Sequence, residues 1–402
     1  MKHLYCIGIG GIGVSALARK YLNDGWRVSG SDRAHSLVTE ELEKLGAKVF
    51  FEQKAANITP DLDLIIYTIA IPENQAELVR ARELGIKTMS YPEALGELSR
   101  DYFTVAVAGT HGKTTTTAML AKICIAAGRD PTVIVGSFLT DGGSNFIPGK
   151  SDLLIVEACE YRRSFLNLEP KVLIITNIDN DHLDYYRDLG DIKSAFAEFA
   201  KRLPSDGTLI TEREYSKIKT DFKLKVPGLH NVHNAQAALS AAAALGINYL
   251  TAIEALENFS GSWRRFEYKG KTDNGALVYD DYAHHPTEIR ATLSGAKEIA
   301  KKKIFVVFQP HLYSRTKLLF NDFATSFTDA DAVIVSPIYA ARERADMDVS
   351  GGKLAEAIGF PKTCFLENFD KIATYLKQKT GPDDLIITMG AGDISELAGR
   401  LL

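Results

Sequence analysis

Short apolar runs, many of them rich in β-branched residues, recur along the whole chain and end in glycine or polar residues. Such runs are typical of strands buried on both faces of a parallel sheet. Helix-forming segments lie between them, so the pattern predicts an α/β fold in which helices connect parallel strands. The predicted strands are residues 4–9, 26–30, 48–51, 62–67, 103–107, 132–135, 152–156, 171–176, 276–279, 303–308, 332–335 and 385–388. The predicted helices include residues 38–45, 74–84, 118–127, 235–245 and 289–300.

The first apolar run leads into a glycine loop with the spacing Gly8-x-Gly10-x-x-Gly13. Gly8 permits a tight turn, Gly10 allows close approach to a diphosphate, and Gly13 allows the next helix to pack against the strand. Asp32 follows the second strand, near the position where an acidic residue meets a ribose. The loop therefore predicts a diphosphate ligand, and these residues alone leave NAD open as one alternative.

A further loop, residues 68–74, follows the strand at 62–67. Ligands of open α/β sheets bind at the carboxyl ends of strands, so this loop is a candidate ligand edge. Asn74 at its end has two interpretations, because asparagine also caps helices well. It either contacts a ligand or begins the helix that follows.

A second glycine loop, Gly109-Thr-His-Gly-Lys-Thr114, joins the strand at 103–107 to a helix-forming run. In a P-loop, backbone N–H groups and a helix N-terminus face a polyphosphate, a lysine offsets its charge, and a hydroxyl meets Mg²⁺. This loop is a variant, since Val107 stands where the general pattern has a glycine. The strand–loop–helix context nevertheless predicts ATP binding; a plain glycine turn with a surface lysine is the alternative.

Charged residues follow the next buried strand. Glu157 stands at the end of the strand at 152–156, where a carboxylate that organises Mg²⁺ belongs. A surface glutamate is the less favoured interpretation, because five apolar residues come directly before it. Glu160, Arg162 and Arg163 suit either an anionic substrate or a solvated turn.

Histidine and asparagine residues mark two more candidate positions. His182 has Asp181 and Asp184 nearby, which could set its tautomer or share a metal. Because Mg²⁺ prefers oxygen ligands, the residues alone leave the role of His182 undefined. A second cluster at the start of the alanine-rich helix either caps that helix or reads a nucleobase edge. It consists of His230, Asn231 and Asn234.

In the last third, four apolar strands again deliver polar or glycine residues at their carboxyl ends. Three of the segments that follow them are residues 280–288, 309–315 and 389–393. Strands that deliver such residues at their carboxyl ends predict a ligand crevice at one edge of an open sheet.

Composition sets the remaining limits. At 402 residues the chain is expected to hold two to four domains, and its net charge of −4 argues against nucleic-acid binding. The four cysteines lie far apart, which suits a reducing compartment and argues against a zinc site. No apolar run reaches membrane-spanning length and the N-terminus has no signal-peptide pattern, so a cytoplasmic protein without membrane contact is expected.

Taken in order, these segments resemble the Mur ligase family over nearly the whole chain. The matching pieces are residues 8–13, 109–114, 157–163, 176–182, 230–234, 264–266, 280–286, 309–315 and 390–393. The resemblance implies a Rossmann-like N-terminal domain that binds a UDP-sugar, a P-loop ATPase-like central domain and a Rossmann-like C-terminal domain that binds an amino acid. The boundaries expected from the sequence are 1–101, 102–261 and 262–402.

The resemblance is strongest to members that join L-alanine to the lactyl carboxylate of UDP-N-acetylmuramate, with ATP and Mg²⁺, in peptidoglycan precursor synthesis. ATP would phosphorylate the carboxylate, and the amine of L-alanine would attack the acyl phosphate. Two alternatives are a family member that recycles murein tripeptide and, less favoured, an NAD-dependent oxidoreductase, which leaves Lys113 and Glu157 unexplained. The chain would act as a monomer or dimer.

The family pattern also implies roles for individual residues. The catalytic residues would be Lys113, Glu157, His182 and His284. Thr114, Glu157 and His182 would be Mg²⁺ ligands. ATP would contact Gly109, Thr110, His111, Gly112, Lys113, Thr114, Thr115, Asn177, His230, Asn231, Asn234, Arg265 and Asp281. The two other substrates would contact Gly10, Gly11, Ile12, Gly13, Asp32, Asn74, Asn145, His284, His311 and Arg315, with Arg315 on the alanine carboxylate.

Two departures from the family pattern are visible. Leu312 stands where arginine is common, so amino-acid binding is expected to differ in detail. The segment between Gly207 and Pro227 is shorter than usual, so the central domain is expected to be trimmed without loss of a catalytic motif.

Overall fold

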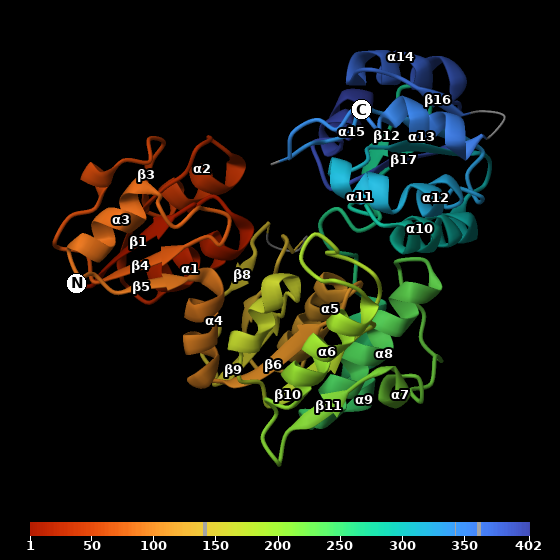
Figure 1. Cartoon of the computed structure of the whole chain (residues 1–402). Coiled ribbons are helices and arrows are strands. Elements are labelled where there is room, and N and C mark those ends of the chain that lie inside the picture. Colours follow the sequence, from red (N-terminus) through yellow and green to blue (C-terminus); the bar gives the residue numbers. More distant parts are fainter. Residues whose placement is uncertain (140–142, 342, 360–362) are drawn as a thin grey trace. The chain divides into compact units, whose positions relative to one another are not determined.

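The computed structural model describes residues 1–139, 143–341, 343–359 and 363–402. It contains three separate sheets, each accompanied by helices (Figure 1). This confirms the predicted α/β class. Close contacts divide the chain into two compact units. Unit 1 is Met1–Ile178, Gly190–Lys219 and Ala235–Leu256, and unit 2 is Asp179–Leu189, Thr220–Asn234 and Glu257–Leu402.

The first sheet, in unit 1, has five strands that are all parallel. Its order is β3 (Lys48–Phe50), β2 (Arg27–Ser31), β1 (His3–Ile7), β4 (Leu64–Tyr67) and β5 (Thr88–Ser90). Its helices are α1 (Ile12–Asn23), α2 (Leu37–Lys44), α3 (Ala76–Glu83) and α4 (Tyr91–Arg100). The strand order changes direction between β1 and β4, which places the glycine loop after β1 at the switch point where nucleotides bind.

The second sheet, also in unit 1, is parallel apart from one antiparallel edge pair, β7 with β8. Its order is β11 (Thr208–Ile210), β10 (Val172–Ile175), β6 (Phe103–Ala108), β9 (Leu153–Glu157), β7 (Thr132–Ile134) and β8 (Phe146–Ile147). Helices α5 (Lys113–Ala126), α6 (Leu189–Ala200), α7 (Glu212–Tyr215), α8 (Leu229–Ala244) and α9 (Tyr249–Glu257) occur in this part of the chain. The P-loop strand β6 lies between β9 and β10, so residues that follow these strands emerge beside the loop.

The third sheet, in unit 2, is parallel except for its edge strand β12. Its order is β12 (Glu267–Lys271), β13 (Leu277–Asp281), β17 (Leu385–Met389), β14 (Ile304–Phe308), β15 (Ala332–Val335) and β16 (Thr363–Phe365). The helices of this part are α10 (Pro286–Ile299), α11 (Tyr313–Leu318), α12 (Phe320–Ala324), α13 (Gly351–Ile358), α14 (Phe369–Lys379) and α15 (Ser395–Leu401).

Successive residues of β14 enter two different cores, as the two-residue period of a strand requires. Val306 and Phe308 pack with residues of α10, α12 and α13, whereas Phe305 and Val307 pack with residues of α14 and α15. Both faces of this sheet are therefore covered, which explains why its strands are continuously apolar.

Four predicted helix starts are wrong. Helix α5 begins at Lys113 rather than at residue 118, and helix α10 begins at Pro286 rather than at residue 289. Helix α8 begins at Leu229 rather than at residue 235, so Asn231 and Asn234 lie inside its first turns. Helix α3 begins at Ala76, and Gln75 caps it by accepting a hydrogen bond from the Leu78 N–H at 2.9 Å. Asn74 is therefore not the cap. None of the helices in the described parts of the chain has the length and apolar character that crossing a bilayer requires.

Candidate active site

The first glycine loop is held by Asp32. The Gly10 N–H donates to Oδ2 of Asp32 at 2.8 Å, and a side chain at Gly10 would collide with that carboxylate. Gly8 has a φ of +79°, which favours glycine. Gly11 and Ile12 lead into α1, and Gly13 gives room to the ring of Tyr91 on α4 rather than to the strand. The loop thus has a fixed shape at the N-terminus of a twelve-residue helix, which suits an anionic ligand.

Asn145 and Asn74 differ in their surroundings. Asn145 is fully buried, and its side-chain nitrogen donates to the carbonyl of Ile12 at 2.5 Å and to the Ser15 hydroxyl at 2.8 Å. It therefore joins the start of α1 to the segment that leads into β8. Asn74 is exposed in the loop after β4.

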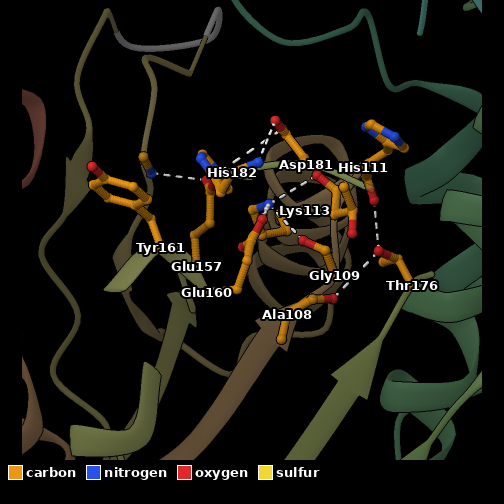
Figure 2. Close-up of polar contacts among 12 residues, drawn as sticks. Ala108, Gly109, His111, Lys113, Glu157, Glu160, Tyr161, Thr176, Asp181 and His182 are labelled. Atoms are coloured by element: carbon orange, nitrogen blue, oxygen red, sulfur yellow. Dashed lines mark hydrogen bonds and ion pairs between the residues drawn. The ribbon is translucent and has the colours of Figure 1, made fainter. Parts of the chain in front are cut away.

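The P-loop has a shape that only glycine permits at two positions. Gly109 has a φ of +139°, and a Cβ atom there would lie 2.0 Å from the Thr176 hydroxyl. Gly112 has a φ of +80° and precedes α5 directly. Thr176 donates to the His111 carbonyl at 2.6 Å, which binds the loop to the end of β10 (Figure 2).

Asn177 also shapes this loop. Its side-chain oxygen accepts from the His111 N–H at 2.9 Å, and its side-chain nitrogen donates to the His111 carbonyl at 3.0 Å. Its own carbonyl accepts from the Thr110 N–H at 3.0 Å. These contacts place Asn177 beside the loop, where its side chain and carbonyl support the loop backbone.

Lys113 is the cation of the loop, and Glu160 is its buried partner (Figure 2). The ammonium group lies 3.0 Å from Glu160 and also donates to the carbonyls of Gly109 and Thr110, at 2.5 and 3.0 Å. Burial alone would lower the pKa of Lys113, but the charge of Glu160 outweighs it and raises the pKa. Lys113 is therefore charged and held inside the loop.

Thr114 and Glu157 lie together at the start of α5 and the end of β9. The threonine hydroxyl is 3.1 and 3.0 Å from the two carboxylate oxygens. The Gly136 N–H donates to Oε2 of Glu157 at 2.8 Å and fixes the carboxylate. A hydroxyl and a carboxylate are oxygen donors of the type that Mg²⁺ prefers, so this pair fits that ion. Thr115 is buried in the same first turn of α5.

In unit 2, Asp181 and His182 belong to a cluster of charged and polar side chains. The His182 N–H donates to Oδ1 of Asp181 at 2.7 Å, and the residue has a φ of +54°. Burial would raise the pKa of Asp181, but the charge of Arg315 and then those of nearby histidines outweigh it and hold the pKa well below its usual range. Asp181 is therefore ionised.

Arg315 connects Asp181 to His311. One guanidinium nitrogen lies 3.1 Å from Oδ1 of Asp181, and another lies 3.2 Å from Nδ1 of His311. A cavity of about 630 Å³ opens beside this ion pair. Its lining is Asn180, Asp181, His182, Leu183, Asp184, Leu312, Ser314, Arg315, Lys317, Leu318, Leu319 and Asp346.

His284 is largely buried between β13 and α10. Its Nδ1 lies 2.9 Å from the carbonyl of Tyr282, which can only accept, so Nδ1 carries the proton and donates. Burial lowers the pKa of His284 to about 3, which keeps the imidazole neutral.

Asp281, at the end of β13, and Arg265, shortly before β12, are close enough to interact electrostatically. Asp281 accepts from the backbone N–H groups of Phe266 and Ala283, at 2.7 and 2.8 Å, and burial raises its pKa to about 6. Its carboxylate therefore supports the loop that carries Arg265. The Arg265 guanidinium lies 5.1 Å from the centre of the Tyr282 ring and is partly exposed.

The side-chain amides of Asn231 and Asn234, in the first turns of α8, form hydrogen bonds with nearby groups of unit 2. Asn231 donates to the carbonyl of Pro227 at 2.7 Å, and Asn234 donates to Asn231 at 3.5 Å. Burial lowers the pKa of His230 to about 4. His230, Asn231 and Asn234 are thus brought together, in unit 2, as a neutral polar cluster.

Three residues of these sites were not singled out by pattern. The sequence pattern places Glu160 only in a charged strand end, and it identifies Asp181 only as a neighbour of His182. Arg264 is almost fully buried, donates to Asp280 at 2.6 Å, and donates to the carbonyls of Gly390 and Gly392. Its charge within an apolar boundary segment, directly before Arg265, was the available signal.

Family models match the chain in three consecutive parts. Residues 3–103 match the Mur ligase family catalytic domain, residues 107–219 the Mur ligase middle domain, and residues 264–392 the Mur ligase glutamate ligase domain. Among curated proteins, the UDP-N-acetylmuramate–L-alanine ligases of Clostridium novyi and Lachnospira eligens are each 42% identical. The alignments cover 100% of this chain and 97% and 98% of those proteins.

Solved structures give the same result. The UDP-N-acetylmuramate-alanine ligase of Thermotoga maritima matches with a TM-score of 0.84 and 30% identity, over 100% of this chain and 98% of that one. A murein peptide ligase from Psychrobacter arcticus matches with a TM-score of 0.71 and 26% identity, over the same shares. The Clostridium novyi alignment has 448 positions against 402 residues here, so that relative carries about 46 residues that this chain lacks.

Proposed function

The chain belongs to the Mur ligase family, and we propose that it is an ATP-dependent ligase that joins L-alanine to the lactyl carboxylate of UDP-N-acetylmuramate. The product is a precursor of peptidoglycan. The observation that carries this proposal is the match, over the full length of the chain, to ligases named for this reaction. Murein tripeptide ligation is a weaker candidate, because the murein peptide ligase structure has the lower identity and TM-score. An oxidoreductase accounts for neither Lys113 nor Glu157.

The P-loop of unit 1 is the proposed ATP site. Its backbone N–H groups and the start of α5 would surround the β- and γ-phosphates, while Lys113 would leave its loop carbonyls and pair with them. Thr114 and Glu157 would hold Mg²⁺, which supplies positive charge next to the transferring phosphoryl group. His182 remains a proposed ligand of a second Mg²⁺ on the family pattern, although an imidazole suits this ion less well than oxygen does.

The remaining nucleotide contacts are proposed in unit 2. His230, Asn231 and Asn234 form the polar cluster assigned to the adenine, and Arg265 is assigned to the ATP phosphates. Asp281 is assigned to the ribose, although its carboxylate is nearly buried and already accepts from two backbone N–H groups. We therefore expect it to act partly by holding the loop of Arg265.

The two other substrates have separate proposed sites. The diphosphate of the UDP-sugar would lie on Gly10, Gly11, Ile12 and Gly13 at the start of α1, with Asn74 and Asn145 nearby and Asp32 bracing the loop. The amino acid would lie beside His284, His311 and Arg315, where the guanidinium would bind its carboxylate.

The lactyl carboxylate is a poor electrophile, so the proposed reaction first activates it by phosphorylation. An oxygen of the lactyl carboxylate attacks the γ-phosphorus of ATP, and ADP leaves. The amine of L-alanine then attacks the carbonyl carbon of the acyl phosphate, and inorganic phosphate leaves as the amide bond forms. Both transition states carry negative charge, so the main task of Lys113 and Arg265 is to place positive charge where it develops.

Release of phosphate from ATP in the presence of UDP-N-acetylmuramate, measured with each of the common amino acids and with murein tripeptide, tests the function. We expect release to depend on L-alanine, and the ligated product to be seen by mass spectrometry. Release that is independent of any amine would contradict the proposal.

The Lys113→Ala variant tests the phosphate site in the same assay. We expect a loss of about 100-fold or more in the rate of product formation, because a charge at the transferring phosphoryl group is removed. Lys150→Ala, at an exposed position, is the matched control and should keep full activity. Equal rates for the two variants would exclude the assigned role of Lys113.

A further inference from the structure

The charged pair beside the cavity of unit 2 has the geometry of a receptor for an α-amino acid. Asp181 and Arg315 come from segments 134 residues apart, yet both lie within unit 2 and meet at 3.1 Å. Their side chains are 9% and 11% exposed, so they are largely removed from solvent and still reach the cavity. A pair of opposite charges at this spacing is complementary to a zwitterion, whose ammonium and carboxylate groups are separated by a single carbon atom.

Neighbouring residues contact both members of the pair and fix their positions. His311 contacts one guanidinium nitrogen of Arg315 at 3.2 Å, and the His182 N–H donates to Oδ1 of Asp181 at 2.7 Å. Nε2 of His182 lies 3.9 Å from Oδ2 of Asp181, which is beyond hydrogen-bond length. A carboxylate has about four acceptor sites on its two oxygens, so Asp181 can accept a further hydrogen bond from a ligand.

The rest of the lining fits a small apolar side chain. Leu183, Leu312 and Leu319 contribute apolar surface to the same cavity. Leu312 is fixed in an unusual conformation, with a φ of +69°, and its N–H donates to the carbonyl of Tyr339 at 2.9 Å. The cavity thus combines one negative group, one positive group and aliphatic walls.

We propose that Asp181 is a specificity-determining residue for the acceptor: its carboxylate accepts a hydrogen bond from the amino group of L-alanine while Arg315 binds the alanine carboxylate. Asp181 thereby selects compounds that carry an amino group next to their carboxylate, and it directs the nitrogen of the nucleophile. This inference rests on the proposed function, because it assumes that L-alanine is the acceptor.

The test compares L-alanine with propionate, which has the same carboxylate and methyl group but no amino group. For the wild type and for Asp181→Asn, we would measure the KM for L-alanine and the inhibition constant of propionate against L-alanine. We expect the substitution to raise the KM for L-alanine about ten- to hundredfold, because a charged hydrogen bond is lost. The inhibition constant of propionate should change far less.

Asp348→Asn is the matched control, because it removes one negative charge of unit 2 from a residue that does not line the cavity. It should leave the KM for L-alanine within about twofold of the wild type, since Asp348 is exposed and pairs with Lys317 rather than with Arg315. Unchanged KM values for ATP and UDP-N-acetylmuramate would show that Asp181→Asn is folded. Asp181→Glu, which keeps the charge that balances Arg315, is the second variant; it should also raise the KM for L-alanine, by misplacing the carboxylate.

The outcomes separate the two proposals. If the wild type releases no phosphate with L-alanine, the proposed function fails. If it does, and the ratio of the two constants is the same in the wild type and in both variants, then Asp181 does not contact the amino group. An equal weakening of alanine and propionate binding would mean that Asp181 acts only by positioning Arg315, which also overturns the inference.

Discussion

In the P-loop, the buried positive charge of Lys113 is balanced by a buried carboxylate. Lys113 is largely buried and its closest charged partner is Glu160, which is almost fully buried. An ammonium group in this environment is stable only with a partner. A bound polyphosphate would supply a second anionic partner, so the contribution of Glu160 to stability should depend on nucleotide.

The Glu160→Gln variant tests that dependence. Without nucleotide, we expect a free energy of unfolding about 3 kcal/mol below that of the wild type, because a buried ion pair is broken. Saturating ATP should remove most of the difference in melting temperature, which differential scanning fluorimetry can measure. Glu169→Gln, which breaks the exposed pair with Arg100, is the control and should have little effect in either condition. A deficit that ATP leaves unchanged would show that Glu160 is purely structural.

Residue-level pKa values also predict how stability depends on pH. Burial lowers the pKa of His284 to about 3 and that of His230 to about 4. Both lie below the ordinary value of 6.5, so folding disfavours the protonated form. The stability from these neutral histidines is therefore complete above pH 6.5 and is lost as the pH falls toward 4. Asp281, whose pKa is raised to about 6, works in the opposite direction.

The His284→Asn variant isolates one of these contributions. Asparagine can still donate to the carbonyl of Tyr282, but it cannot titrate. Between pH 7.5 and pH 5, we expect the wild type to lose about 1–2 kcal/mol more than the variant in its free energy of unfolding. Urea denaturation at the two pH values measures this loss of stability. The contribution of Asp281 cancels in the comparison, because both proteins contain Asp281. Identical losses would contradict a neutral, buried His284.

Long-range partners were beyond the reach of sequence patterns. Glu160 lies 47 residues from Lys113, and Asp181 lies 134 residues from Arg315. The residue types and their positions after strands predicted that these loops carry charge. Which charges pair depends on the order of the strands in each sheet, and a local pattern does not contain that order.

At the scale of elements, apolar runs predicted twelve strands to within one or two residues at each end, whereas β5, β8, β11, β12 and β16 were not among the predicted runs. The predicted runs at 103–107 and 385–388 became β6 and β17, each longer by one residue. The larger errors in element bounds are at helix starts. At Leu229 the polar residues that follow suggested a cap, whereas the backbone was already helical and the amide of Asn231 reached back to Pro227.

The connection between β6 and α5 yields a sharp prediction about one element. Alanine at Gly109 would require a φ of +139° and would place Cβ 2.0 Å from the Thr176 hydroxyl, so the P-loop would have to move. We expect Gly109→Ala to lose at least about 2 kcal/mol of stability and nearly all ligase activity. Gly128 has a φ of +70° but open space around it, so Gly128→Ala should cost only about 1 kcal/mol and leave activity intact. Chemical denaturation and the phosphate-release assay measure both effects, and similar behaviour of the two variants would contradict the steric argument.

At the scale of the whole molecule, three family models in order agree with three sheets. The predicted boundaries near 101 and 261 are simpler than the observed division into compact units. Unit 2 includes residues 179–189 and 220–234 in addition to the C-terminal part, and α8 belongs to both units. A sequence read from one end to the other does not reveal that a central segment packs with a later domain.

One of the places where the chain passes from unit 1 to unit 2, between Lys219 and Thr220, lies in the shortened central segment. Residues 216–228 contain no helix or strand, and the four lysines of this stretch are exposed. They are Lys217, Lys219, Lys223 and Lys225. A protease needs an extended, accessible backbone, so limited trypsin treatment should cleave here before it cleaves within the sheets.

Mass spectrometry of the first two fragments would locate the cut between Lys217 and Lys225. Replacing the four lysines with glutamine should delay cleavage strongly and leave the rate of ligation unchanged, because none of them is assigned to the active site. ATP and UDP-N-acetylmuramate together should slow the cut if substrates restrict the connection, as ligand binding stabilises a folded state against local opening. A first cut inside β6 to β10 instead would mean that the central sheet, and not the trimmed connection, is the least stable part of the molecule.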